Sequence, residues 1–217
     1  MGSRQGTAML RNILITLKES LLYDVFTNRL FIAGFTIFML ILIFGFVGPI
    51  FAYQDVFGAV DAPYQPPSPK HLLGTNHRGE DIYSWISIGL RNSLWIAALA
   101  ALIQVLIAFT IGTFAGYIGG YLDAALNTIS NAMMVIPMFI VLLMLLAYIP
   151  AQLRTMMLVA ILIGVTGWPA QARVFRVLAM ENKSRDYVDL AKVTNFSTTE
   201  IVLKEIAPNI LSYTVLT

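Results

Sequence analysis

The stretch NSLWIAALAALIQVLIAFTIGTFAGYIGGYL, residues 92–122, contains no Asp, Glu, Lys or Arg, and three more uncharged apolar runs occur elsewhere in the chain. A transmembrane helix needs about 20 apolar residues, and a Lys or Arg at its centre costs about 2.5–3.5 kcal/mol. The sequence therefore predicts an all-α fold, a polytopic bundle of membrane helices. The expected spans are residues 30–54, about 92–118, 124–150 and 155–178.

Composition supports this fold class. Hydrophobic residues make up 58% of the chain and charged residues 12%, and the mean hydropathy is +0.75. Soluble domains carry about a quarter charged residues, so a soluble surface is excluded. The net charge of +2 is small and forms no long basic face, so we expect a lipid bilayer and no nucleic acid as partner. Cysteine is absent, which excludes disulfides and thiolate metal sites.

The positions of Lys and Arg predict the topology. Four precede the first span and six lie from Arg173 onward, whereas the intervening loops hold four. Four crossings return the chain to its starting side, and the positive-inside rule assigns that side to the cytoplasm. We expect residues 1–29 and the loop 181–208 in the cytoplasm, and residues 55–91 outside. The outer loop is rich in proline, and an interfacial helix is expected to begin after Asp81.

Possible metal ligands occur together only in the outer loop. His71 and His77 lie close in sequence to Glu80 and Asp81, but their spacing fits no standard zinc pattern. We therefore expect no metal site and read the histidines as hydrogen-bonding residues.

Several residues within the spans have two readings. Glycines four residues apart, Gly112, Gly116 and Gly120, indicate a face for close helix packing. Pro137 removes a helix hydrogen bond in the third span, which gives either a gate or a fixed bend. Methionines near it either line a pathway or fill gaps. The candidate pathway residues are Met133, Met134, Pro137 and Met138.

The loop after the fourth span has ordered turn chemistry. A short helix is expected from Tyr187 to Thr194, and Asn195 tolerates the left-handed backbone that ends helices. Ser197 and Glu200 have the spacing of a capping box that starts a second helix. Pro208 is expected to interrupt the chain before a fifth span, which starts near residue 209.

At these residues the chain resembles permeases of binding-protein-dependent ABC importers, whose loop carries Glu-Ala-Ala, a glycine and a closing proline. The corresponding places here hold Asp189-Leu190-Ala191, Asn195 and Pro208. The resemblance runs from about Asp24 to Thr217 and is to the second permease of the oligopeptide, dipeptide and nickel branch. Three further stretches carry it: residues 71–81 (HLLGTNHRGED), residues 116–123 (GYIGGYLD), and Trp168-Pro169 with Ala172-Arg173.

The resemblance implies the type I permease fold, a bacterial or archaeal cytoplasmic membrane, a second permease subunit, two ATPase subunits and an extracytoplasmic substrate-binding protein. The chain lacks a Gly-Lys dipeptide and hence a P-loop, so ATP and Mg belong on the ATPase subunits; we expect no bound cofactor, no catalytic residue and no enzyme activity here. The implied ATPase-coupling residues are Tyr187, Asp189, Leu190, Ala191, Lys192, Asn195, Ser197, Glu200 and Pro208.

The family also continues through two more spans, so we expect a chain that lacks its last two. Di- or oligopeptides are the leading substrates, with nickel chelates or oligosaccharides as alternatives. Two other functions compete. A secondary transporter would place ionisable residues within its spans, and a non-transporting scaffold would not need the ordered loop at 181–208.

Overall fold

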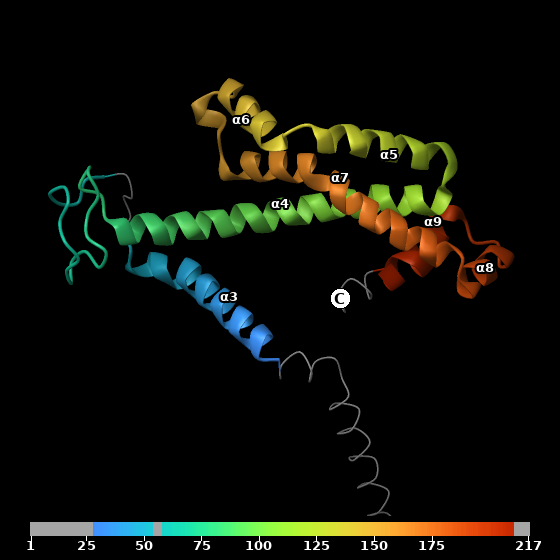
Figure 1. The fold of residues 1–217 in the computed structure, drawn as a ribbon, viewed down its shortest axis with the longest axis horizontal. Coiled ribbons are helices and arrows are strands. Elements are labelled where there is room, and N and C mark those ends of the chain that lie inside the picture. The colour runs from blue at the N-terminus through green and yellow to red at the C-terminus, as the bar shows by residue number, and fades with distance from the viewer. Residues whose placement is uncertain (1–27, 54–57, 211–217) are drawn as a thin grey trace, which may run out of the picture. The chain divides into compact units, whose positions relative to one another are not determined.

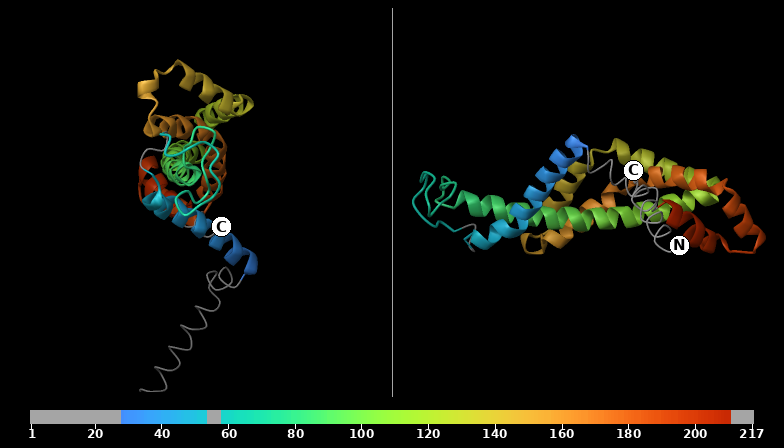
Figure 2. Two further views of the ribbon diagram at one scale, coloured as in Figure 1. Left: turned by 90° about the vertical axis from the view of Figure 1, so that its left-hand side faces the viewer. Right: turned by 90° about the horizontal axis from the view of Figure 1, so that it is seen from below.

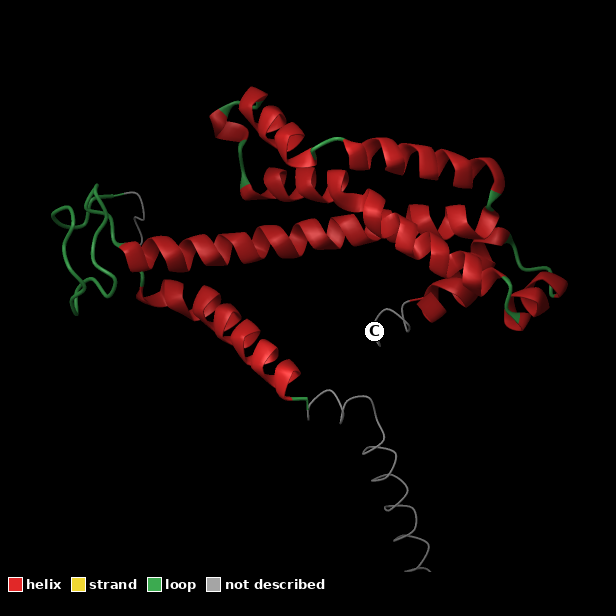
Figure 3. Cartoon of the chain, viewed as in Figure 1, coloured by secondary structure: helices red, strands yellow, loops and turns green. Residues whose placement is uncertain are grey.

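The computed structural model describes residues 28–53 and 58–210 (Figure 1). In these residues the regular elements are helices, and the extended pairing is one isolated bridge between Thr75 and Asp81 (Figure 3). The predicted all-α class is therefore confirmed. In order, the elements are α3 (Arg29–Val47), η1 (Gly48–Phe51), α4 (Ile82–Ile118), α5 (Gly120–Val135), α6 (Met138–Tyr148), η2 (Ala151–Leu153), α7 (Met156–Lys183), α8 (Asp186–Val193), α9 (Thr198–Glu200) and the π-helical segment η3 (Ile201–Ile206).

Three helices are long and apolar enough to cross a membrane: α3 with η1, α4, and α7. The bent pair α5 and α6 makes a fourth crossing if it is one span. The expected cytoplasmic segment 1–29 lies almost wholly outside the described residues, as does the fifth span beyond Ile210. By internal contacts the chain divides into two units, the first ending at Leu94 and the second beginning at Trp95.

In the first unit, α3 begins at Arg29 because the side chain of Asn28 accepts the N–H groups of Leu30 and Phe31, at 2.9 and 3.4 Å. Most of its large apolar side chains are exposed, as expected for a helix in lipid. Gly45 is the buried residue of α3, and a Cβ there would lie 2.6 Å from Leu94 Cδ1. The glycine therefore permits close contact with α4.

One expectation about α4 was wrong. The interfacial helix predicted after Asp81 is not separate, because its residues form the first turns of the 37-residue helix α4. No proline interrupts residues 82–118, and Gly89 alone does not end a helix. At 1.5 Å per residue, α4 is about 55 Å long, which exceeds the roughly 30 Å hydrocarbon core.

In the second unit, the glycines of α4 pack against α7. A Cβ on Gly112 would lie 3.0 Å from Phe175 Cβ and would also meet the backbone of Ala172, and one on Gly116 would lie 3.0 Å from Ala179 Cβ. The packing role predicted for these two residues is confirmed. It was wrong for Gly120, which lies beyond the end of α4, has a φ of 59° and meets nothing within 4 Å. Gly119 and Gly120 instead turn the chain into α5.

The third predicted span is broken. Helices α5 and α6 meet at an angle of 77°, and Pro137 stands at the break as the N-cap of α6. The predicted bend is confirmed, although it divides the span into two helices instead of curving one. Helix α5 lies beside α7 (Figures 1 and 2). Helix α7 contains Pro169 and continues to Lys183, beyond the predicted end at residue 178.

Candidate functional site

Residues 184–210, which follow α7, form one compact segment, called the α8 segment below. Helix α8 runs from Asp186 to Val193, one residue earlier at each end than predicted. Its buried side chains, Val188 and Ala191, join a hydrophobic cluster with Ile201 and Ile206 of η3. A helix of eight residues is not stable alone, so this burial is what holds α8 in place.

The opposite side of α8 is exposed and partly apolar. Leu190 is 66% exposed and Val193 is 81% exposed, although both are hydrophobic. On the flank of this exposed side, Lys192 donates to Asp189 at 2.7 Å, and this hydrogen bond raises the pKa of Lys192. Helix α8 thus has one face fixed within the chain and another that presents apolar side chains outward.

The turn after α8 has the predicted chemistry. Asn195 has a φ of 62°, in the left-handed region, and its N–H donates to Lys192 O at 3.2 Å. The capping box is present: Glu200 N–H donates to Ser197 Oγ at 3.3 Å, and Ser197 N–H donates to Glu200 Oε2 at 3.0 Å. The hydrogen bond from Lys204, followed by those from the amide and hydroxyl of Ser197, lowers the pKa of Glu200 to about 2.

The expectation for Pro208 was wrong, because the helix continues through it to Ile210. In the π-helical segment before it, Ala207 N–H donates to Val202 O, five residues earlier. A proline inside an α-helix lacks a donor and collides with the carbonyl four residues before it. The wider π turn relieves this conflict, so the proline does not end the helix.

The candidate pathway residues lie elsewhere. Met134 and Pro137 are exposed near the break between α5 and α6, whereas Met133 in the last turn of α5 and Met138 in the first turn of α6 are half-buried. The structure places them together at this break and not in the α8 segment.

Sequence reasoning missed two polar links between α5 and α7. Arg176 forms a two-pronged ion pair with Asp123, with Nη2 2.7 Å from Oδ2, and Arg173 donates to Asn131. Opposite charges in two spans are the signal for such a pair, but a single sequence does not reveal which residues meet.

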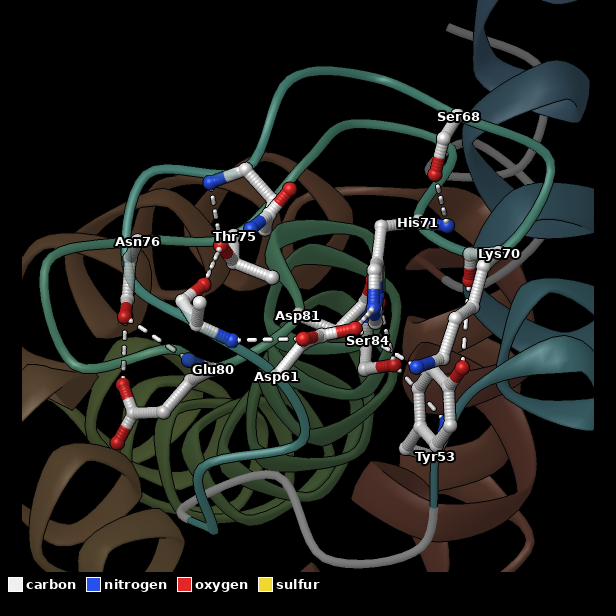
Figure 4. Close-up of polar contacts among 12 residues, drawn as sticks. Tyr53, Asp61, Ser68, Lys70, His71, Thr75, Asn76, Glu80, Asp81 and Ser84 are labelled. Carbon is white, nitrogen blue, oxygen red and sulfur yellow. Dashed lines mark hydrogen bonds and ion pairs between the residues drawn. The ribbon is translucent and has the colours of Figure 1, made fainter.

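A second polar cluster shapes the loop of residues 58–81 in the first unit (Figure 4). His71 is buried, and its Nδ1 lies 2.9 Å from Asp81 Oδ1, while its Nε2 lies 3.4 Å from Asp61 Oδ2. Asp81 also accepts the N–H of Ser84 at 2.8 Å, which caps the start of α4. Because its two ring nitrogens face different carboxylates, His71 acts here as a hydrogen-bonding residue, in keeping with the sequence reading.

The carboxylates of this loop are held ionised. Lys70, then the amide of Ala62 and His71, lower the pKa of Asp61 to about 2. Burial opposes ionisation of Asp81, but the hydroxyl and amide of Ser84 lower its pKa on balance. Asn76 Nδ2 donates a hydrogen bond to Glu80 Oε2 at 2.5 Å, and this bond lowers the pKa of Glu80. Charged hydrogen bonds therefore fix the loop against the first turn of α4.

The chain is similar in sequence to several known permease proteins. The chain is 28% identical over 185 residues to the oligopeptide transport system permease protein OppC of Bacillus subtilis, covering 84% of this chain and 59% of that protein. It is 29% identical over 183 residues to the dipeptide transport system permease protein DppC of the same organism, covering 84% and 56%. The OppC protein of Mycobacterium tuberculosis strain H37Rv is 29% identical over 188 residues, covering 85% and 64%. The chain thus spans about three fifths of the length of these relatives.

The family described as "Binding-protein-dependent transport system inner membrane component" matches residues 108–217, half of the chain. The match begins in α4 before its packed glycines and includes α5, α6, α7 and the α8 segment. Together with its several apolar helices, this match makes the chain a multi-pass inner-membrane protein. The chain belongs to the family of binding-protein-dependent transport system inner membrane components.

Proposed function

We propose that this chain is one of the two permease subunits of an ATP-driven importer of di- and oligopeptides. In the proposed complex it forms half of the translocation pathway beside a second permease. Two ATPase subunits bind ATP and Mg and supply the work, and an extracytoplasmic binding protein delivers the substrate. The peptide substrate is inferred from relatives whose names specify oligopeptide and dipeptide transport.

In the proposed topology, residues 58–81 face outside and the α8 segment lies in the cytoplasm. This orientation rests on the distribution of Lys and Arg. It places α8 on the side where ATP is present.

The observation that carries the proposal is the two-sided character of α8. Its buried side anchors it to η3, and its outer side presents Leu190 and Val193 to a partner. Exposed apolar side chains on a rigid helix favour docking into a groove of another protein. Movement of the ATPase would then shift α8 and, through η3 and α7, the spans.

The burial of each α8 side chain decides which substitution can test docking. Ala191 is buried against η3, so enlarging it disturbs the segment itself and does not probe a partner. Leu190 is the better probe because it is exposed. In the assembled importer, we expect Leu190→Ser to reduce co-purification of the ATPase and peptide uptake into proteoliposomes.

Leu203 provides the matched control, since it is an exposed leucine on η3 of the same segment. We expect Leu203→Ser to retain the ATPase and its stimulation by peptide-loaded binding protein. If Leu190→Ser and Leu203→Ser both behave as the wild type does, α8 is not the docking element.

A further inference from the structure

An apolar groove of about 370 Å³ lies between α4, α5 and α7 in the second unit. Its floor includes Ala115 and Leu126, which are buried in the hydrophobic core. The side chains along its rim are between 39% and 52% exposed: Ile111, Leu122 and Ile129. Trp168 of α7 also lines the groove. A buried floor and an exposed apolar rim suit a long apolar ligand that enters from the side.

The groove reaches the start of α5, because Leu122 is the third residue of this helix. The N-cap residue, Gly119, has no side chain that could accept the free N–H groups of the first turn. Asp123 does not accept them either, since both oxygens of its carboxylate are bonded to Arg176. A Cβ on Gly120 would meet nothing within 4 Å, so the backbone is accessible here. The positive end of the α5 dipole is therefore open to an anion.

A lysine adds a full positive charge at the same place. Helix α7 ends at Lys183, beside the turn that joins α4 to α5, and a Cβ on Gly119 would lie 3.8 Å from Lys183 Nζ (Figure 1). The ammonium is 5.7 Å from the centre of the Tyr117 ring and forms no salt bridge within residues 28–53 and 58–210. An anion at this turn would be stabilised by the ammonium and by the helix dipole together.

The groove and the turn match the two parts of a phospholipid. An acyl chain fits the apolar groove, which extends for about 10 Å along α5 between Leu122 and Ile129, and a phosphate fits the positive turn at its end. Tyr121, beside the turn, is 89% exposed, and tyrosine is enriched where membrane meets water. In the proposed topology the turn faces the cytoplasm, the side on which basic pockets between membrane helices bind anionic head groups.

We propose that this groove binds an acyl chain of an anionic phospholipid from the cytoplasmic leaflet, and that Lys183 and the first amides of α5 bind its phosphate. The inference goes beyond the proposed function and uses only its topology. It also gives a role to residues 116–123, GYIGGYLD, in which helix packing explains Gly116 but not the two glycines of the turn. The bound lipid holds together the ends of α4, α5 and α7.

Trp168 reports on the groove directly. The chain has three tryptophans, so Trp85→Phe and Trp95→Phe leave Trp168 as the single fluorophore. The full chain is placed in nanodiscs of phosphatidylcholine and phosphatidylglycerol, and the acyl chains of one lipid or the other carry bromine, which quenches tryptophan on contact. We expect brominated phosphatidylglycerol to occupy the site about fivefold more favourably than brominated phosphatidylcholine, the scale of one lysine at an anionic surface.

Lys183→Gln tests the phosphate site. It should bring the relative affinity for the two lipids close to one, whereas Lys183→Arg, which keeps the charge, should retain the preference. Lys204→Gln is the matched control, because it removes the same charge from an ammonium that lies 2.9 Å from Glu200 and away from the groove lining. It should retain the preference as well.

Ala125→Leu tests the groove, since Ala125 lines it and a larger side chain would fill it. We expect weaker quenching of Trp168 by both brominated lipids. Ala124→Leu makes the same change at the neighbouring exposed position, which does not line the groove, and should leave the quenching as it was.

Two kinds of result would overturn the proposal. Equal quenching by the two lipids, which a free phosphate at the turn would also give, or a preference that survives Lys183→Gln, would exclude an anionic lipid as the occupant. Absence of quenching by either lipid would show that a protein surface covers the groove. None of these measurements involves an ATPase or a peptide, so the lipid site and the proposed function can fail separately.

Discussion

Arg176 on α7 and Asp123 on α5 form a two-pronged ion pair, although 53 residues separate them in the sequence. Each side chain is only 20% exposed. Removing one partner of such a pair leaves the other charge poorly compensated. We predict that Asp123→Asn lowers the free energy of unfolding by about 1–3 kcal/mol. Thermal unfolding of the detergent-solubilised protein measures this loss.

The charge-swapped variant Asp123→Arg, Arg176→Asp is the control. It keeps both charges and should recover part of the loss in Tm. A swap that is no more stable than Asp123→Asn would show that the pair contributes through packing and not through charge.

The glycine contact between α4 and α7 gives a steric prediction. A Cβ on Gly116 would meet the backbone of Arg176 and lie 3.0 Å from Ala179 Cβ. Because neither helix backbone moves easily in a packed bundle, we expect Gly116→Ala to destabilise the protein by about 1–3 kcal/mol. Gly89→Ala, on the same helix with nothing within 4 Å, should be neutral or slightly stabilising. Equal Tm values for the two variants would show that α4 and α7 are not tightly packed at Gly116.

The loop of residues 58–81 should loosen in acid. The pKa of Asp61 is about 2 in the folded loop and 3.8 ordinarily, so its contribution is complete above pH 4 and is lost as the pH falls toward 2. The pKa values of Glu80 and Asp81 are lowered too and act in the same direction. We expect hydrogen-exchange protection of this loop, normalised to the intrinsic rate, to fall over that range.

Asp61→Asn should flatten this pH dependence, because the titrating carboxyl is removed. Glu200→Gln is the comparison, since Glu200 also has a pKa of about 2 but caps α9. It should change protection near α9 and leave residues 58–81 as in the wild type. A loop whose acid response is the same in Asp61→Asn as in the wild type would contradict the assignment.

The topology is testable because the chain has no cysteine. Leu72, exposed in the 58–81 loop, and Ser184, exposed between α7 and α8, can each be replaced by cysteine. We predict that a membrane-impermeant thiol reagent labels Leu72→Cys in intact cells, whereas Ser184→Cys is labelled only after the membrane is opened. The reverse pattern would invert the proposed orientation.

Local rules predicted the short-range features well. The gaps between charges indicated long apolar helices, although not their ends, and the spacing of Ser197 and Glu200 found the capping box, because these signals depend on neighbours in sequence. Asn195 was placed correctly for the same reason. Gly120 was misplaced because a four-residue spacing does not say where a helix ends.

Features that depend on tertiary contact were not predictable. The sequence did not pair Arg176 with Asp123, or show that Ala191 faces inward while Leu190 faces outward. Which side of α8 is buried depends on η3, whose position is set by the turn at Asn195. A single sequence contains no record of such pairings.

The π-helical segment Ile201–Ile206 has a consequence for helical phase. A π turn is equivalent to one extra residue inserted into an α-helix, so everything after it is rotated by about 100° relative to an unbroken helix. Ile206 and Ile210 are both fully buried with this extra residue in place. Removing one residue from the segment would restore α-helical winding, bring Pro208 into conflict with the preceding turn, and rotate Ile210 away from the core. The additional residue of the π turn thus determines that the side chain of Ile210 faces the same core as that of Ile206.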